Sequence, residues 1–125
     1  MNKIEFNIIL MLILFQYALG QDFSNETFEF DSNTREYQLY IPSSYSENSL
    51  SPLMFNFHGG NGTSQGQIAI SDMRDLADEN NFILVYPQAI ADPTDDGSLN
   101  WIFKGDSDHD DIYFIDALIS ELSNQ

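Results

Sequence analysis

Two short, nearly continuous apolar runs limit the fold more than any other feature of the sequence. Residues 53–57 (LMFNF) and 82–86 (FILVY) have the length of β-strands, and neither alternates as a strand with one solvated face does. Such runs are typical of strands covered on both faces. Between them, residues 64–80 carry apolar side chains at helical spacing and open with Ser64-x-x-Gln67, which fits a capping box. The order strand, helix, strand predicts a βαβ unit with parallel strands and a right-handed crossover.

The flanking segments complete an α/β fold. Residues 27–30 and 36–41 alternate polar and apolar side chains around turn-forming residues at 31–34, so we expect an antiparallel strand pair with one buried face. Residues 110–122 predict a helix with an apolar stripe, capped by Asp108 or Asp110. No further strand follows this helix in the sequence. We therefore expect the strand at 82–86 to carry an unpaired edge.

The first twenty residues have the features of a cleaved secretory signal. Lys3 lies near the start, residues 8–15 are apolar, and Ala18, Leu19 and Gly20 precede the expected cleavage point. The apolar run is short for a transmembrane helix. The sequence thus predicts a signal peptide at 1–20, one small domain at 21–125, and a secreted, extracellular protein.

Charge and composition narrow the class of partner. The net charge is −16, and such an acidic surface repels phosphate backbones and anionic lipid. We therefore expect neither a nucleic-acid partner nor a membrane partner. The absence of cysteine excludes disulfides and thiolate chemistry.

The acidic stretch at 105–111 resembles a calcium loop only at first. Asp106, Asp108 and Asp110 alternate as ligands do in an EF-hand. The EF-hand pattern then requires a glycine where Asp111 stands and a glutamate where Ala117 stands. We expect a solvated loop that leads into the last helix, and no metal site.

Residues 62–66 (GTSQG) match the G-x-S-x-G pattern of a serine-hydrolase nucleophile. Ser64 would be that nucleophile, and the chain order of the other triad members is met by an aspartate at 92, 95 or 96 and by His109. A nucleophile elbow needs a strand that leads straight into its first glycine, but four residues separate Phe57 from Gly62. The sequence therefore favours Ser64 as a helix cap and His109 as an exposed loop histidine.

Residues 58–62 (HGGNG) stand in a better context for chemistry. They directly follow the first buried strand and precede a helix, which is where hydrolases place the oxyanion loop. Glycine lets backbone N–H groups approach an oxygen that becomes negative in the tetrahedral intermediate. We expect Gly59, Gly60 and Asn61 to form this loop and His58 to orient it. An ordinary glycine-rich turn is the alternative.

Trp101 is the only tryptophan, in a long polar loop at 88–108. A loop of this length is usually functional or disordered. Trp101, with Phe103 nearby, has two interpretations. It lines a substrate cleft, or it packs beneath the long loop.

Five segments, taken in order, resemble a known family. They are REYQLYIPSSY (35–45), PLMFNFHGGNGTSQGQ (52–67), MRDLADENNFILVYPQ (73–88), NW (100–101) and DDIYFIDALISEL (110–122). The combination resembles secreted polyhydroxybutyrate depolymerase-like and feruloyl or acetylxylan esterases of the α/β-hydrolase fold, over most of residues 35–122.

The resemblance implies a serine esterase without a metal or organic cofactor, acting on extracellular polymeric or plant cell-wall esters. It implies that Gly60 or Asn61 donates a backbone N–H to the oxyanion, and that Trp101 lies near the substrate cleft. In the family, the nucleophile elbow follows the strand after the last helix seen here, and the acid and the histidine come later. No residue of this sequence matches them, so we expect the N-terminal part of an α/β-hydrolase, ending before the nucleophile strand and inactive alone. The alternative is a small acidic secreted binding or structural domain without catalytic activity.

Overall fold

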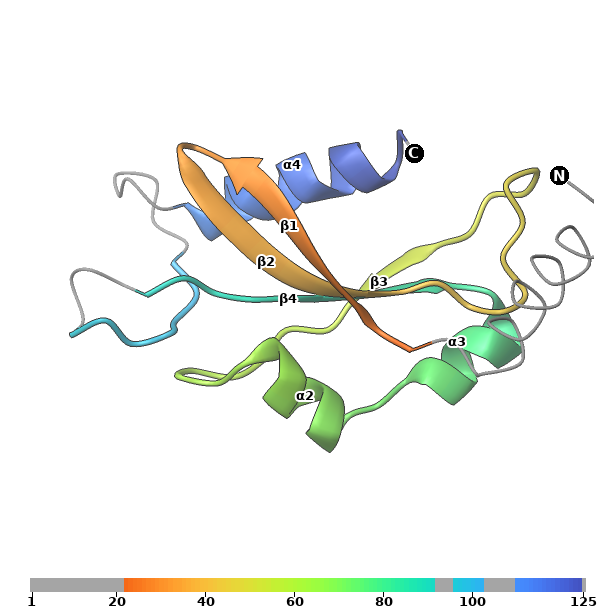
Figure 1. Cartoon of the computed structure of the whole chain (residues 1–125), viewed down its shortest axis with the longest axis horizontal. Helices are drawn as coiled ribbons and strands as arrows, with labels where there is room; N and C mark the ends of the chain where they lie inside the picture. The colour runs from red at the N-terminus through yellow and green to blue at the C-terminus, as the bar shows by residue number, and fades with distance from the viewer. Residues whose placement is uncertain (1–21, 92–95, 103–109, 125) are drawn as a thin grey trace, which may run out of the picture.

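The computed structural model describes residues 22–91, 96–102 and 110–124 (Figure 1). The predicted signal peptide at 1–20 lies outside the described residues, as do Asp92, Asp95, Phe103, Asp106, Asp108 and His109. No helix in the described ranges is both long enough and apolar enough to cross a membrane.

A mixed sheet of four strands forms the centre of the described structure. The strands are β1 (Ser24–Phe30), β2 (Asn33–Tyr40), β3 (Leu53–Phe55) and β4 (Ile83–Pro87), in the spatial order β1-β2-β4-β3. β1 and β2 pair antiparallel, β2 and β4 pair antiparallel, and β3 and β4 pair parallel. The predicted α/β class, the antiparallel strand pair and the parallel βαβ unit are therefore confirmed.

Helices cover both faces of this sheet (Figure 1). On one face, α4 (Asp111–Leu122) packs Phe114 and Leu118 against Tyr37 and Val85. The other face is covered by α2 (Ser64–Ile70) and α3 (Arg74–Asn80), and its core includes Ala77 and Leu84. In β4, the residues from Leu84 to Tyr86 are fully buried, because alternate side chains enter the two cores.

The unpaired edge of the sheet belongs to β3, so the expectation for the strand at 82–86 was wrong. β4 is bonded on one side to β2 and on the other to β3. The N-terminal hairpin joins the same sheet beside β4, and this pairing has no local sequence signal. β3 therefore ends the sheet on its side in the described structure.

The predicted single helix at 64–80 is two short helices, separated at residues 71–73. The Ser71 carbonyl accepts a hydrogen bond of 2.6 Å from the Tyr86 hydroxyl, and the Asp72 carboxylate accepts one from the Arg74 backbone N–H. The Asp72 side chain thus competes with helical hydrogen bonding, as aspartate side chains often do, while Tyr86 occupies the Ser71 carbonyl. Asn81 then ends α3 in the left-handed conformation that asparagine tolerates (φ 53°).

The hairpin turn is tighter than predicted. It consists of Asp31 and Ser32, both with positive φ (51° and 62°), and Phe30 already pairs with Asn33. Two residues with positive φ fit the right-handed twist of the flanking strands. The strands are consequently longer than the alternation at 27–30 and 36–41 indicated.

Asp78 joins β2 to α3. Its carboxylate accepts hydrogen bonds from the Tyr40 hydroxyl at 2.9 Å and from the Ser43 N–H at 2.8 Å. Burial, followed by the interaction with Asp78, raises the pKa of Tyr40 to about 12. Burial opposes ionisation of Asp78, but the hydrogen bonds from Ser43 and Tyr40 outweigh it and hold the pKa of Asp78 below its ordinary value.

The folded-state pKa of Tyr40 lies above the ordinary value of 10.0, so the protonated Tyr40 hydroxyl stabilises the folded state. This contribution is fully present below pH 10 and is lost as the pH rises toward 12. We expect the free energy of unfolding to fall over this range, and to fall less steeply in Tyr40→Phe. Urea denaturation at a series of pH values measures, for each protein, how steeply the free energy of unfolding falls with pH. Equal slopes in the two proteins would contradict this assignment.

Candidate active-site loop

The loop at 58–62 lies where β3 gives way to α2, at the carboxyl end of a parallel strand. His58 is buried, with an exposed fraction of 3%, whereas Gly59, Gly60 and Asn61 are exposed. The Gly62 N–H donates to the Gly59 carbonyl at 3.0 Å, which closes a turn across the loop. Asn61 takes the left-handed conformation with a φ of 56°. The exposed glycines therefore stand on a folded turn rather than on an open strand end.

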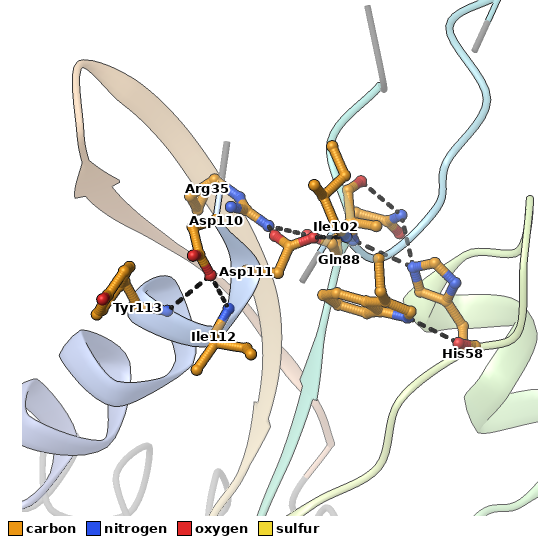
Figure 2. A network of polar contacts seen from close by, with 10 residues as sticks. Arg35, His58, Gln88, Ile102, Asp110, Asp111, Ile112 and Tyr113 are labelled. Carbon is orange, nitrogen blue, oxygen red and sulfur yellow. Dashed lines mark hydrogen bonds and ion pairs between the residues drawn. The ribbon is translucent and has the colours of Figure 1, made fainter. Parts of the chain in front are cut away.

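His58 holds this turn from below. Its Nε2 accepts the Ala89 backbone N–H at 3.1 Å, and Figure 2 shows Gln88 beside the same ring. Because Nε2 is the acceptor, the ring proton lies on Nδ1, which donates to the Gly59 carbonyl at 2.7 Å. The Nε2 lone pair is thus committed within the protein, and His58 serves as an orienting residue rather than as a general base.

Gln88 connects the loop to the sheet and to α2. It directly follows β4, and its side-chain Oε1 accepts the Ser64 N–H at 2.9 Å while its Nε2 lies 3.1 Å from His58 Nε2. Its backbone N–H donates to the Glu36 carbonyl on β2. Gln88 was not predicted as a residue of this site. Its place just after a buried strand that is parallel to β3 was the available signal, because side chains at the carboxyl ends of parallel strands meet at one edge.

Residues 98–102 cover the loop from the other side. The Asn61 N–H donates to the Leu99 carbonyl at 3.0 Å and also lies 3.2 Å from Asn100 Oδ1. The Trp101 indole N–H donates to the His58 carbonyl at 2.8 Å. The Trp101 ring packs on the His58 ring, with centroids 4.9 Å apart, and meets Phe57 edge-on. Trp101 therefore supports the loop at 58–62, whereas its two predicted interpretations placed it in a substrate cleft or beneath the long loop at 88–108.

These contacts decide which N–H groups of the loop remain available. Asn61, one of the two donors implied by the resemblance, already donates to Leu99. Gly62 donates to Gly59. The N–H of Gly60 donates to no acceptor within the described ranges. Of the two donors that were considered, Gly60 is the one that can meet an oxyanion.

A buried ion pair fixes the covering segment to the core. Arg35 of β2 and Asp111 of α4 are 1% and 5% exposed, and Arg35 Nη2 lies 2.6 Å from Asp111 Oδ1. The other carboxylate oxygen accepts the Ile102 N–H at 2.7 Å, and the Ile102 carbonyl accepts the Asp111 N–H at 2.8 Å. Figure 2 shows Asp111 lying between Arg35 and Ile102. The arginine also stacks on Phe114, with its guanidinium carbon 3.8 Å from the ring centroid.

Arg35 was also missed at the sequence level. It occupies the same face of its strand as Tyr37 and Leu39, which was a signal of a buried cation that requires a partner. The partner comes from the start of the last helix. Asp110, the preceding residue, caps that helix by accepting the N–H groups of Ile112 and Tyr113 (Figure 2). Of the two predicted caps, Asp108 and Asp110, the structure thus confirms Asp110.

Ser64 is not the predicted cap of α2. That role belongs to Thr63, whose hydroxyl accepts the Gly66 N–H at 3.0 Å, while the Gln67 side chain donates to Asn56 instead of completing a capping box. Ser64 is buried, with an exposed fraction of 4%. Within the described ranges, no hydrogen bond joins its hydroxyl to a histidine or a carboxylate, and this includes Asp96. The contacts that would activate a nucleophile are therefore absent from this part of the chain.

An apolar hollow of about 300 Å³ lies next to the loop. Its lining includes the apolar side chains Phe57, Trp101, Ile102, Ile112 and Ile115. It lies between the end of β3 and the start of α4. The hollow thus adjoins both the exposed loop and the open edge of the sheet.

Comparison with models of known protein families and with curated protein sequences gave no match.

Gly60 and Gly59 make a matched pair for testing this loop. A β-carbon at Gly60 would lie 3.0 Å from Asn100 Oδ1, whereas one at Gly59 would meet nothing within 4 Å. We expect Gly60→Ala to displace Asn100 and to lower the free energy of unfolding by about 1 kcal/mol, the value of one hydrogen bond. Gly59→Ala should change it by much less. Urea denaturation measures both, and equal effects would contradict the packing described here.

Removing one member of the buried ion pair should be far more costly. We expect Asp111→Ala to lower the free energy of unfolding by about 3–5 kcal/mol, because it leaves the Arg35 charge buried without a partner. Asp116→Ala, an exposed change on the same helix, is the control and should stay within about 0.5 kcal/mol of the parent. The double variant Arg35→Met/Asp111→Leu should unfold at higher urea than Asp111→Ala alone. If it does not, the buried charge is not the cause of the loss.

Proposed function

We propose that this chain provides the oxyanion loop of a secreted serine carboxylic ester hydrolase, related to polyhydroxybutyrate depolymerase-like, feruloyl or acetylxylan esterases. The observation that carries the proposal is the exposed Gly60, whose N–H has no acceptor in ranges 22–91, 96–102 and 110–124 and which stands on a turn fixed from both sides. In α/β-hydrolases, one oxyanion donor comes from the loop between the third strand and the helix after it. The loop at 58–62 occupies the corresponding position between β3 and α2.

One free donor is sufficient for this role. The second oxyanion donor in α/β-hydrolases is the N–H of the residue that follows the nucleophile. A donor contributes most when it is held in place before the reaction, since no energy is then spent on reorienting it. His58 and Trp101 supply that support here, through the Gly59 carbonyl and the His58 carbonyl.

The handedness of strand crossovers indicates where a nucleophile would join this loop. Crossovers between parallel strands are almost always right-handed. The crossover from β3 to β4 runs over the face of α2 and α3, and α4 lies on the opposite face (Figure 1). The first crossover leads from β3 to its neighbour β4. A second right-handed crossover that starts from β4 and passes over the opposite face must lead back in the direction of β3. A parallel strand after α4 would therefore lie beyond β3, against its open edge.

The open edge is suited to receive such a strand. The Pro52 carbonyl and the Asn56 N–H bond to β4, so the alternating backbone groups of Leu53 and Phe55 point away from it. The apolar hollow at Phe57 and Ile115 continues this surface. Parallel strands end at the same edge of a sheet, so a nucleophile after the added strand would stand beside Gly60. This geometry supports an acyl-enzyme mechanism with Gly60 as oxyanion donor.

The substrate class follows from the resemblance. We propose an extracellular polymeric or plant cell-wall ester as the substrate of the complete enzyme, with no metal or organic cofactor. Trp101 was implied as a substrate contact. Its N–H is already bonded to His58, so any contact with substrate would come from its ring.

A chimaera tests this function directly. Residues 22–124 would replace the matching segment of an active polyhydroxybutyrate depolymerase-like esterase, and hydrolysis of p-nitrophenyl butyrate would be measured. We expect activity that is retained in Ser64→Ala, because the recipient enzyme supplies the nucleophile. Gly60→Ala should lower kcat more than Gly59→Ala does, since only the former displaces Asn100.

A fluorophosphonate probe and circular dichroism provide the controls. The expected adduct lies on the recipient's serine, with none on Ser64. A folded chimaera that carries the adduct but shows no preference between the two glycine variants would remove Gly60 from the oxyanion hole. An adduct on Ser64 in the parent chain would overturn the proposal altogether.

A further inference from the structure

A polar cavity of about 220 Å³ lies between the β1–β2 hairpin and the start of α2. It belongs to the face of the sheet that carries α2, because Gln38 shares its side of β2 with Tyr40, whose ring packs in the core beneath α2 and α3. The residues that line it supply amides, hydroxyls and the two carboxylates of Glu26 and Glu36, together with Tyr37. From the hairpin come Asn25, Thr27, Glu36 and Gln38, and from α2 come Ser64 and Gln65.

Two buried side chains leave hydrogen-bonding capacity at this cavity. Ser64 is 4% exposed, and its hydroxyl has no partner within the described ranges. Gln38 is 7% exposed, and its Nε2 donates to Asn25 Oδ1, which leaves the Gln38 carbonyl and the Asn25 amide N–H groups without partners among the described residues. These atoms are not sealed in the core, since Arg35 Nε is the one buried side-chain nitrogen or oxygen without a partner in the described part of the chain. They face the cavity and are open to water or to a ligand there.

The lining excludes several classes of ligand. An anion would find no lysine or arginine there and would be repelled by Glu36. An apolar ligand would leave the amides and hydroxyls unpaired. A divalent cation prefers several carboxylate ligands, and no group of three metal-ligating side chains occurs in the described part of the chain.

We propose that this cavity binds one neutral, hydroxyl-rich ring, such as a single sugar unit. Each hydroxyl of a sugar is both a donor and an acceptor, and an amide offers both kinds of group side by side. The volume lies below the roughly 300–1,000 Å³ of pockets for drug-sized ligands, which fits a ligand of one ring. No aromatic side chain provides a stacking surface, since Tyr37 turns its ring into the core beneath α4.

This site is separate from the proposed oxyanion loop, although Gln88 touches both. The Gln88 amide borders the cavity, and it also contacts His58 behind the loop. A sugar held there would sit beside the ester-binding loop of an enzyme that acts on polysaccharide esters. Binding itself requires no catalysis, so it can hold or fail independently of the proposed esterase function.

Nuclear magnetic resonance of the full chain can test the site through its own side-chain amides. Methyl β-xylopyranoside and methyl β-glucopyranoside are the probes. We expect saturable shifts of the Asn25 and Gln38 side-chain NH₂ signals, with a Kd on the order of millimolar for at least one glycoside. Ser64→Ala and Thr27→Val should each weaken binding about fivefold, as the loss of one hydrogen bond predicts.

Thr34→Val is the matched control, because it makes the same change on the same hairpin outside the cavity. It should leave the Kd unchanged. The absence of a saturable shift with both glycosides would overturn the proposal. A calcium titration that saturates the same amide signals, and that no longer does so in Glu36→Gln, would also overturn it. The cavity would then be a cation site. If Thr27→Val and Thr34→Val weakened glycoside binding equally, the loss would come from a change in the hairpin as a whole and not from a lost contact in the cavity, and the proposal would be overturned.

Discussion

The ion pair between Arg35 and Asp111 is the interaction on which the other contacts around the loop depend. It joins the sheet to the helix on one of its faces, and the same carboxylate bonds the backbone of Ile102. A buried ion pair contributes little net stability compared with well-packed apolar residues, but the loss of either partner is costly. Its main effect here is therefore positional. It fixes where α4 begins and where residues 98–102 cross the end of the sheet.

From that segment the contacts pass on to the exposed glycines. Trp101 bonds the His58 carbonyl and Leu99 bonds Asn61, while Gln88 and Ala89 hold the His58 ring from the sheet side. The turn at 58–62 is thus fixed from both sides although it lies on the surface. A glycine-rich segment would lose much conformational freedom on folding, and these contacts offset that cost. A fixed turn with an N–H that no described residue accepts is what electrostatic stabilisation of an oxyanion requires.

Local patterns in the sequence predicted most of the framework. The two apolar runs predicted strands, and alternation predicted the hairpin, because both patterns reflect which faces of a strand meet the core. Burial on both faces holds for β4 but was wrong for β3, where Met54 and the following Phe57 are exposed at the edge of the sheet. The errors arose where a distant residue decided the outcome. Tyr86 draws the Ser71 carbonyl out of the helix predicted at 64–80, and β2 pairs with the edge of β4 that was expected to be open. Neither contact has a local signature.

In the candidate loop, too, local patterns were predictable and contacts with distant residues were not. The sequence determined that HGGNG follows a buried strand and precedes a helix, because strand and helix signals and glycine usage are local properties. It also determined a chain without cysteine and with a strong excess of negative charge. Only the tertiary structure decided that the Asn61 N–H donates to Leu99 while the Gly60 N–H has no acceptor among the described residues. It also decided that His58 orients the turn and that Gln88 connects it to the sheet. Those outcomes depend on hydrogen bonds between residues that are 24 or more positions apart, which form only when the folded backbone brings them within bonding distance.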